Sequence, residues 1–387
     1  MPSALPATKP LTIGIDARAA TEVGAGRGRV VRELLLELSG RGDQHGYRLY
    51  ARVPWQDLGP RFTWVTVPDR DPLWHLITAR QASRECDVFL STNSYLTAWF
   101  TSVPTVVFVY DLVAFDRSLR PNLRSAIIER LTLGVATRRA AAFVAISRST
   151  SDQLLERFPR CAARTSVALL GAARSLGTTT SAGAEDTVDP HIALLREGGF
   201  VLAVGTLEPR KNLPRLIEAF GRLPAALQDA YPLAVVGARG WQTGETLEAL
   251  RSLGERAQIL GYVSDAALAE LYRRCAVFCY PSLGEGFGLP VLEAMAAGAA
   301  VVTSSVSSLP EVGGDAVEYA DPRDVDSIAA ALRRVLDDHA LRADLGARAV
   351  QRAGEFSWAA FAQATSGVLE RAAAARREHP PLDGDGA

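Results

Sequence analysis

Two glutamates bracket a glycine-rich turn, and this short segment has more chemical content than any other part of the chain. It runs from Glu285 to Glu293 and reads EGFGLPVLE. Glycine lets backbone N–H groups approach a ligand closely, and the helix pattern that starts at Pro290 adds the partial positive charge of a helix N-terminus. Such a turn suits anionic or hydroxyl-rich ligands. Glu293 lies about two helical turns beyond Glu285, so we expect both carboxylates on one side of a site. The alternative is a tight turn with two solvated glutamates.

A second glycine-rich loop lies near the N-terminus. Residues Gly24–Gly28 follow a predicted strand at 11–16 and precede a helix pattern at 30–38. The order of strand, glycine loop and helix is the arrangement that cradles phosphate groups, although glycines also make plain loops. The pair Tyr110–Asp111 follows another apolar strand pattern, at 105–110. Ligands of parallel sheets bind beyond such strand ends.

Short apolar runs rich in β-branched residues alternate with helix patterns along most of the chain. This alternation predicts parallel sheets that are covered by helices on both faces. The first series of elements ends near residue 146, and a second series runs from 200 to 337. Because 387 residues exceed the ~250–300 at which a single core stops growing, we expect two domains.

The predicted boundaries follow from composition. An N-terminal domain takes residues 1–180 and a C-terminal domain takes 190–357, joined by a linker at 172–189 that is rich in small and polar residues. A last helix, at about 358–377, is expected to pack back on the N-terminal domain. The tail 379–387, rich in Pro, Gly and Asp, is predicted to be disordered.

Composition and charge exclude several classes of protein. A hydrophobic content of 48% and a charged content of 22% are ordinary for a globular protein. A net charge of −1, without an aromatic stacking platform, argues against nucleic-acid binding.

The first ten residues lack a signal-peptide stretch and no run of ~18 apolar residues could span a bilayer, so we expect a cytoplasmic protein. The four cysteines form neither a CxxC pair nor a zinc spacing, which predicts free thiols.

One basic stretch indicates a further contact. Residues 117–139 contain six arginines and a single acid, Glu129, interleaved with Ile and Leu. A basic amphipathic helix of this kind can dock on anionic lipid at the inner face of a membrane, or bind a lipid-diphosphate acceptor. The simpler interpretation is a helix with an apolar core stripe and a solvated basic face.

Five motifs occur in the order found in one known family. They are Gly205–Asn212, Gly237–Trp241, Gly261–Ser264, Pro281–Glu293 and Ser308–Val312. On these motifs, the chain resembles the retaining GT-B glycosyltransferases of family GT4, especially their mannosyl- and rhamnosyltransferase-like members, over nearly all of residues 11–375. The resemblance implies an α/β fold in which two Rossmann-like, doubly wound domains face each other across a cleft.

The resemblance also implies a nucleotide-sugar site. Arg210 and Lys211 would hold the donor diphosphate, which suits a fixed guanidinium fork beside a mobile ammonium. Glu293 would accept hydrogen bonds from the ribose hydroxyls, and Glu285 would hold hydroxyls of the donor sugar. The other donor-binding positions that the family implies are Gly24, Gly26, Gly205, Arg239, Tyr262, Val263, Gly286, Phe287, Gly288 and Leu289.

The implied mechanism uses neither a metal nor a cofactor. No Asp-x-Asp triplet stands at the end of a predicted strand, so the charge of the leaving diphosphate would be stabilised by Arg210, Lys211 and helix dipoles. Members of the family retain the anomeric configuration. Front-face attack is therefore implied, with the departing phosphate taking the proton of the acceptor.

Tyr110 is the main departure from the family pattern. Many members have His-Asp after the strand that ends at Val109, with the histidine reaching the donor sugar, whereas this chain has Tyr110–Asp111. A phenol can hydrogen-bond a hydroxyl, but its pKa of ~10 excludes imidazolium-type assistance at neutral pH. None of the five histidines pairs with an acid at catalytic spacing, and only His75 is considered for acceptor contact. The implied catalytic residues are Arg210, Lys211, Glu285, Tyr110 and Asp111.

The predicted activity is hexosyl transfer. A hexose or deoxyhexose would move from a nucleotide-diphosphate sugar to a hydroxyl of a glycan, lipid-linked or natural-product acceptor. Two alternatives stay open: a donor-binding partner subunit with impaired catalysis, which Tyr110 would explain, and a nucleotide-sugar epimerase on the same fold. The nucleobase, the sugar and the acceptor stay undetermined.

Overall fold

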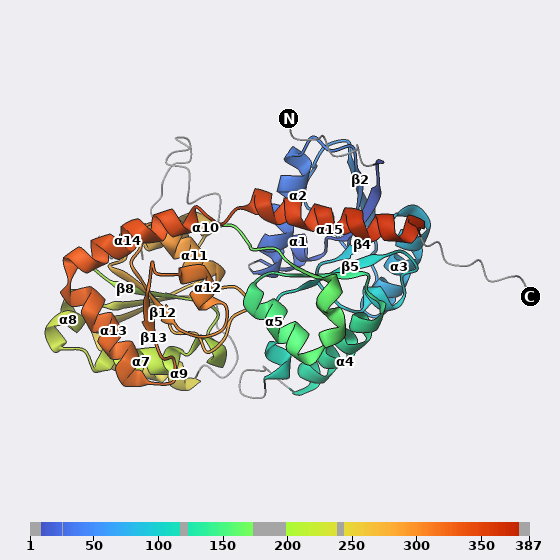
Figure 1. Ribbon diagram of the computed structural model, residues 1–387. Coiled ribbons are helices and arrows are strands. Elements are labelled where there is room, and N and C mark those ends of the chain that lie inside the picture. Colours follow the sequence, from blue (N-terminus) through green and yellow to red (C-terminus); the bar gives the residue numbers. More distant parts are fainter. Residues whose placement is uncertain (1–8, 25, 117–122, 173–198, 238–243, 379–387) are drawn as a thin grey trace, which may run out of the picture. The chain divides into compact units, whose positions relative to one another are not determined.

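The computed structural model describes residues 9–24, 26–116, 123–172, 199–237 and 244–378. Arg239, the predicted tail and nearly all of the predicted linker lie outside these ranges. The chain divides into two compact units, each described by itself (Figure 1). The N-terminal unit comprises Met1–Leu170 together with Trp358–Ala387, and the C-terminal unit comprises Gly171–Ser357.

The N-terminal unit contains a seven-stranded parallel sheet in the order β3-β2-β1-β4-β5-β6-β7. Its strands are β1 (Thr12–Asp16), β2 (Gly46–Ala51), β3 (Phe62–Thr66), β4 (Val88–Ser91), β5 (Thr105–Val109), β6 (Ala142–Ala145) and β7 (Thr165–Val167). Its α-helices are α1 (Ala19–Glu22), α2 (Arg27–Gly40), α3 (Leu73–Glu85), α4 (Leu123–Arg139), α5 (Arg148–Arg157) and α15 (Trp358–Glu378). Helix α15 packs against α2, β4, β5 and β6, so the end of the described chain belongs to this unit.

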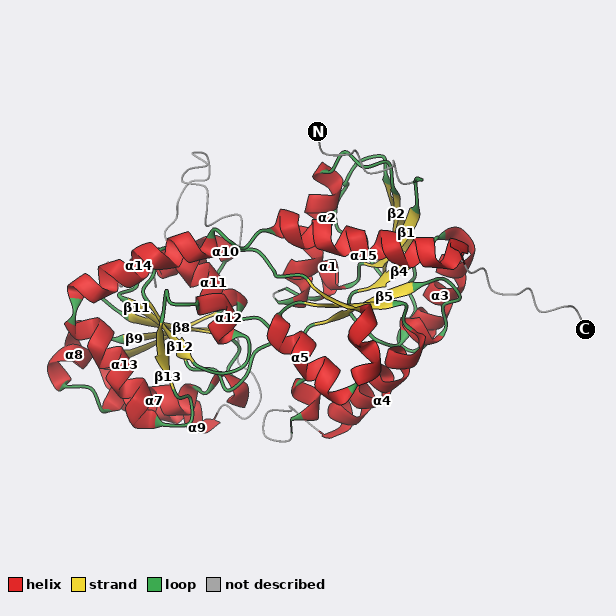
Figure 2. Cartoon of the chain, in the orientation of Figure 1, coloured by secondary structure: helices red, strands yellow, loops and turns green. Residues whose placement is uncertain are grey.

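The C-terminal unit contains a six-stranded parallel sheet in the order β10-β9-β8-β11-β12-β13. Its strands are β8 (Val201–Val204), β9 (Leu233–Val236), β10 (Ala257–Gly261), β11 (Val277–Tyr280), β12 (Val301–Ser304) and β13 (Glu318–Ala320). Its α-helices are α7 (Leu213–Gly221), α8 (Ala225–Ala230), α9 (Gly244–Ser252), α10 (Asp265–Arg274), α11 (Leu289–Ala296), α12 (Leu309–Gly313), α13 (Val325–Asp337) and α14 (His339–Ala353). Helices flank the strands on both faces (Figure 2).

These elements form for local reasons that the sequence displays. The central strands are apolar and buried along their whole length, as in β5 (TVVFV) and β11 (VFCY), which is expected for a sheet covered on both faces. Several helices start at a side-chain cap: Ser147 Oγ accepts a hydrogen bond from Thr150 N, and Ser264 Oγ accepts one from Ala267 N. The predicted α/β, doubly wound class is confirmed.

The structure adds elements that the sequence patterns did not predict: the strands β3, β7 and β13 and the helices α1, α3, α5, α8, α12 and α14. Strand β3 is an edge strand with every residue partly or fully exposed, so it lacks the apolar run of a central strand. The four cysteines are free, and three of them are buried. Within the described residues, no helix is long and apolar enough to cross a membrane.

Candidate functional site

Each sheet has one point where the strand order reverses. In the C-terminal unit this point lies between the neighbouring strands β8 and β11, and in the N-terminal unit it lies between β1 and β4. Doubly wound sheets bind ligands beyond the carboxyl ends of the strands at such a point, because the loops there turn away from each other. The segments Gly205–Lys211 and Pro281–Glu285 follow β8 and β11, so both start at this edge of the C-terminal sheet.

Arg210, Lys211 and Glu285 form an ion-paired cluster at this edge. The Lys211 Nζ atom lies 2.7 Å from Glu285 Oε1, and Arg210 Nη1 pairs with Glu285 Oε2. Arg210 Nη2 also lies 2.8 Å from Glu208 Oε1. The side chains of Arg210, Lys211 and Glu285 are 20%, 13% and 8% exposed. Two cations therefore share one buried carboxylate, and both keep some access to solvent.

Two hydroxyl groups complete the surroundings of Glu285. Tyr280 OH donates to Glu285 Oε1 at 2.8 Å, and Ser282 Oγ donates to the same oxygen at 2.7 Å. Lys211 Nζ donates a further hydrogen bond to the Tyr280 oxygen. Burial by itself raises the pKa of Glu285, but Lys211 and Arg210 outweigh it and lower this pKa to about 2. Glu285 is consequently ionised at neutral pH and acts as an acceptor only.

The surroundings of Lys211, in contrast, disfavour the charged form of its side chain. Burial lowers the pKa of Lys211; the neighbouring Glu285 raises it, while Arg210 lowers it further, and the net direction is downward. An additional anion, such as a phosphate group, would favour the charged ammonium.

Serine side chains fix the loop that carries Glu285. Ser307 Oγ accepts from Glu285 N at 2.9 Å, and Ser308 Oγ donates to the carbonyl oxygens of Glu285 and Phe287 at 3.0 and 2.8 Å. Gly288 precedes α11 with φ of 106°, and an added Cβ there would lie 2.7 Å from a methyl group of Leu309. Only glycine meets both conditions, so the turn into α11 depends on it.

Glycines also shape the ends of β8 and β9. An added Cβ on Gly237 would lie 2.0 Å from the carbonyl oxygen of Gly205, and one on Gly205 would lie 3.3 Å from the Lys211 side chain. Both residues have φ near +150°. A side chain at either position would keep the two loops from approaching each other or Lys211 this closely.

The remaining donor-site positions of the C-terminal unit differ in exposure. Glu293 is 5% exposed on α11, and Tyr272 OH donates to its Oε2 atom at 3.4 Å. Phe287 is buried and packs edge-to-face on Phe356, with ring centroids 5.9 Å apart. After β10, Tyr262 is 79% exposed whereas Val263 is buried. Gly286 is buried too, and Leu289 is the first residue of α11.

The glycine loop of the N-terminal unit is held by an arginine. Arg32 Nη2 donates to the Gly24 carbonyl oxygen at 2.5 Å, and Arg32 Nη1 donates to those of Ala20 and Val23 at 3.0 and 3.1 Å. Gly26 stands at the N-cap of α2 with φ of 56°. Both of these glycines are exposed.

Gly28 is required by packing. A Cβ at this position would lie 1.8 Å from the carbonyl oxygen of Val23 and 2.7 Å from that of Ala19. Helices α1 and α2 consequently approach each other through a glycine that no other residue can replace without backbone movement.

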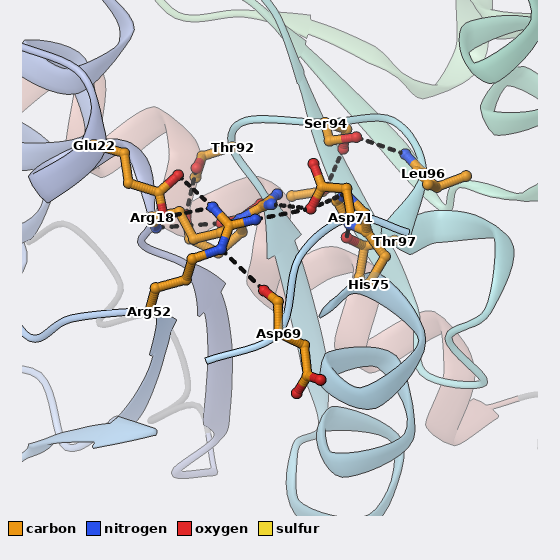
Figure 3. A network of polar contacts seen from close by, with 12 residues as sticks. Arg18, Glu22, Arg52, Asp69, Asp71, His75, Thr92, Ser94, Leu96 and Thr97 are labelled. Carbon is orange, nitrogen blue, oxygen red and sulfur yellow. Dashed lines mark hydrogen bonds and ion pairs between the residues drawn. The ribbon is translucent and has the colours of Figure 1, made fainter. Parts of the chain in front are cut away.

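A second arginine–carboxylate cluster occupies the reversal point of the N-terminal sheet (Figure 3). Arg18 is 2% exposed and pairs with Asp16 (Nη2 to Oδ2, 2.8 Å) and Asp71 (Nη1 to Oδ1, 2.8 Å). Its guanidinium stacks 3.6 Å from the ring centroid of Trp74. Arg52 bonds Asp71 from the solvent side, at 3.1 Å. Asp71 belongs to an Asp-x-Asp triplet shortly after β3, a strand that the sequence patterns missed.

His75 is part of this cluster. Its Nδ1 lies 2.7 Å from Thr97 Oγ1 and its Nε2 lies 3.5 Å from Asp71 Oδ1. Burial, with a further contribution from Arg18, lowers the pKa of His75 to about 4. The residue is 1% exposed. The histidine considered for acceptor contact is therefore a neutral, buried member of the Arg18 cluster.

Tyr110 lines a cavity of about 250 Å³ inside the N-terminal unit. The other lining residues are Arg27, Thr92, Asn93, Ser94, Tyr95, Phe108, Ile128, Glu129 and Thr132. Tyr110 is 7% exposed, and its hydroxyl group has no hydrogen-bond partner among the described residues. Arg27 lies over its ring, 5.2 Å from the centroid. The neighbouring Asp111 accepts a hydrogen bond from Val113 N at 3.1 Å and so caps the turn that follows β5.

Sequence analysis missed Tyr280, Ser282 and Glu208, which complete the Arg210–Lys211–Glu285 cluster. A signal was available for two of them, because Tyr280 ends a predicted strand and Ser282 follows it within the same motif. Among the described residues, no three His, Cys, Asp or Glu side chains lie close enough to hold a metal ion.

Comparisons with known proteins agree with this fold. Residues 189–352 match the model of the glycosyl transferases group 1 family. The O-antigen chain mannosyltransferase B of Escherichia coli is 47% identical over 163 residues, which are 41% of this chain and 42% of that protein. The serotype-specific mannosyltransferase WbdA of Escherichia coli is 34% identical over 272 residues, which are 66% of this chain and 32% of that protein.

A solved structure extends the likeness to the whole fold. The structure of WaaG, a glycosyltransferase involved in lipopolysaccharide biosynthesis, matches with a TM-score of 0.69 at 18% identity, over 92% of this chain and 99% of WaaG. The two doubly wound units and this likeness define a GT-B fold. The match of residues 189–352 to the glycosyl transferases group 1 family confirms the resemblance. The matches span less than half the length of the two curated relatives.

Proposed function

We propose that this protein is a retaining, metal-independent hexosyltransferase that moves mannose or a related hexose from a nucleotide-diphosphate sugar to a hydroxyl group of an acceptor. The observation that carries the proposal is the Arg210–Lys211–Glu285 cluster at the β8/β11 reversal point. The mannosyltransferase relatives favour mannose as the transferred sugar. The acceptor class is a glycan, a lipid-linked sugar or a small natural product.

The cluster suits a diphosphate leaving group. Arg210 presents a planar fork of donors and Lys211 a compact charge, and both are partly exposed. Each already bonds Glu285, so an incoming diphosphate would meet two cations held in place by a carboxylate. The N-terminus of α11, which begins at Leu289 and follows Gly288, would add partial positive charge.

Charge stabilisation by these groups would replace a metal ion. As the bond between the sugar and the diphosphate breaks, negative charge grows on the leaving oxygen, where fixed cations stabilise the transition state more than the ground state. In the proposed front-face reaction, that oxygen takes the proton of the acceptor hydroxyl. Glu285, with its pKa near 2, is proposed to orient the two cations and the sugar hydroxyls, since so weak a base cannot take that proton at neutral pH.

The first test is a thermal-shift panel of GDP-, UDP-, dTDP- and ADP-linked sugars in the presence of a chelator. A donor at ~100 times its dissociation constant should add ~2.7 kcal/mol to the free energy of unfolding, a shift of a few degrees. One nucleotide class should stand out. If no donor changes the melting temperature, the donor-site assignment is wrong.

A second measurement separates transfer from binding. A donor that binds should also be hydrolysed slowly or transferred to an added acceptor, with retained configuration at the anomeric carbon by NMR. Binding without either reaction would instead identify the chain as a donor-binding subunit with impaired catalysis.

A further inference from the structure

The cavity of the N-terminal unit is built for an uncharged, hydroxyl-rich ligand. Its lining includes Arg27, Glu129 and Tyr110, whose buried hydroxyl group has no hydrogen-bond partner among the described residues. Arg27 forms no ion pair with any described residue. Burial and then Asp111 raise the pKa of Glu129, and Arg27 is near enough to this acid to lower it. The aromatic ring of Phe108 supplies an apolar wall. At about 250 Å³, the cavity is smaller than a site for a drug-sized ligand, which fits one sugar unit.

Helix α4 forms one wall of this cavity and also carries an apolar surface. Ile128, Glu129 and Thr132 line the cavity. On the helix surface opposite to the buried residues, four large apolar side chains are exposed: Leu123 by 57%, Ile127 by 46%, Ile128 by 54% and Leu131 by 63%. We call these four residues the outward face of α4. Leu123, Ile127 and Leu131 are spaced by four positions, and Ile128 follows Ile127 directly, so all four lie on one side of the helix.

The outward face is unusual in this chain and is continuous with the cavity. Of the ten exposed large apolar residues in the described part of the chain, four belong to it. Ile128 is shared, because it lines the cavity and is half exposed. The exposed charged residues of α4 near this face are basic (Arg124, Arg138 and Arg139), whereas the only acid of the helix, Glu129, lines the cavity. A ligand with a sugar in the cavity could thus continue onto an apolar and cationic surface.

We propose that the acceptor is an amphiphile, with its terminal sugar in the cavity beside Tyr110 and its apolar portion along the outward face of α4. The proposal rests on the proposed function and selects the lipid-linked class from the acceptors named above. The Tyr110 hydroxyl group would bond a sugar hydroxyl, which gives this buried donor a partner that no described residue supplies. The apolar chain would cover side chains that are otherwise exposed to water.

The test compares methyl and octyl glycosides of the same hexose, for mannose, glucose, galactose and N-acetylglucosamine. Binding is measured by titration calorimetry below the micelle concentration and without a donor. For the hexose that fits, the octyl glycoside should bind at least about tenfold more tightly, because burial of two methylene groups already accounts for such a factor. Equal affinities for the two glycosides, or no binding by any of the eight, would overturn the proposal.

Two variants and a control locate the effect. The double variant Ile127→Gln/Leu131→Gln should bind the octyl glycoside only as tightly as the methyl glycoside. Tyr110→Phe should weaken both glycosides by the same factor, about threefold to tenfold, because it removes one hydrogen bond. Val350→Gln, which changes an exposed apolar residue of the C-terminal unit, should behave as wild type.

The design also distinguishes a lipid surface from an amphiphilic acceptor. If the double variant loses binding to vesicles of anionic lipid but keeps the chain-length preference, the outward face docks on membranes and the proposal fails. Failure of the proposed function would be seen separately, as a lack of stabilisation by nucleotide sugars, since glycoside binding is measured without them.

Discussion

The two units place an arginine–carboxylate cluster at the same point of the same kind of sheet, but the central arginine is buried in one cluster and both cations stay partly exposed in the other. Arg18 is 2% exposed, stacks on Trp74, and pairs with Asp16 and Asp71. Arg210 and Lys211 share Glu285 and remain 20% and 13% exposed. A saturated and buried arginine holds structure together, whereas a partly exposed pair can take a further anion.

The difference also explains where each unit offers room for a ligand. In the N-terminal unit, the Arg18 cluster fills the reversal point, and Thr92 at the end of β4 donates a hydrogen bond to the Asp16 carbonyl oxygen. The cavity lies next to this cluster, where it is lined by Thr92, Phe108 and Tyr110. In the C-terminal unit, the two cations at the reversal point stay partly exposed. The same sheet topology thus supports a structural cluster in one unit and a candidate binding cluster in the other.

The largest expected effect is on the stability of the N-terminal unit. Arg18→Met should lower the free energy of unfolding by about 3–5 kcal/mol, because it leaves Asp16, which is fully buried, without its counter-charge. Urea denaturation measures this. The double variant Asp16→Asn/Arg18→Met also removes the unpaired carboxylate charge, so it should recover at least about 1 kcal/mol of the free energy of unfolding. A single variant as stable as wild type would show that the Arg18 cluster does not hold the unit together.

Acid should destabilise the two units in different pH ranges. The pKa of His75 is lowered from 6.5 to about 4, so its contribution is complete above pH 6.5 and is lost between pH 6.5 and 4. The pKa of Glu285 is lowered from 4.5 to about 2, so its contribution is lost between pH 4.5 and 2. Each amounts to about 3 kcal/mol, at 1.36 kcal/mol per pKa unit.

Chemical denaturation at a series of pH values checks this order. The N-terminal unit should weaken first on acidification, and His75→Gln should flatten its dependence between pH 6.5 and 4. If both units lost stability over the same range in wild type and variant, the two clusters would not differ in the way proposed.

Removal of the Lys211 ammonium should reduce transfer more than binding. Lys211→Ala should lower the transfer rate about a hundredfold, or about 2.7 kcal/mol, because charge on the leaving diphosphate grows in the transition state. The affinity for the nucleotide sugar should fall less than tenfold. Single-turnover rates and titrations measure the two effects. Lys9→Ala, at the other lysine of the sequence, is the matched control. An unchanged rate would remove Lys211 from the transition state.

The smallest expected effect concerns Glu293. Glu293→Ala should weaken nucleotide binding about tenfold, or 1.4 kcal/mol, if its carboxylate accepts bonds from the ribose. Glu285→Ala should instead mainly reduce transfer. Titration with the free nucleotide and with the nucleotide sugar tests both, and Glu270→Ala, on the exposed side of α10, is the control. Equal binding and turnover in both variants would contradict the assignment of this site.

The sequence by itself determined the class of fold, most of the central strands, and the chemical character of the donor segments. Apolar runs, caps and glycine positions act on neighbouring residues, so they can be interpreted locally. Arg210 and Lys211 are adjacent in the chain, and the turn from Glu285 to Glu293 is a continuous segment. The exposed edge strand β3 and the helices α3, α5 and α14 were not predicted, because apolar and polar residues alternate less regularly in them.

Only the tertiary structure decided which groups meet. Glu285 reaches Arg210 and Lys211 across more than seventy positions, and Arg18 reaches Asp71 across 53. These pairs depend on strand order, which places β8 beside β11 and puts β3 and β1 on either side of β2. No local pattern encodes that order, because it follows from how all the strands and helices bury their apolar faces together. For the same reason, the burial of His75 and the cavity at Tyr110 could not be predicted from the residues next to them.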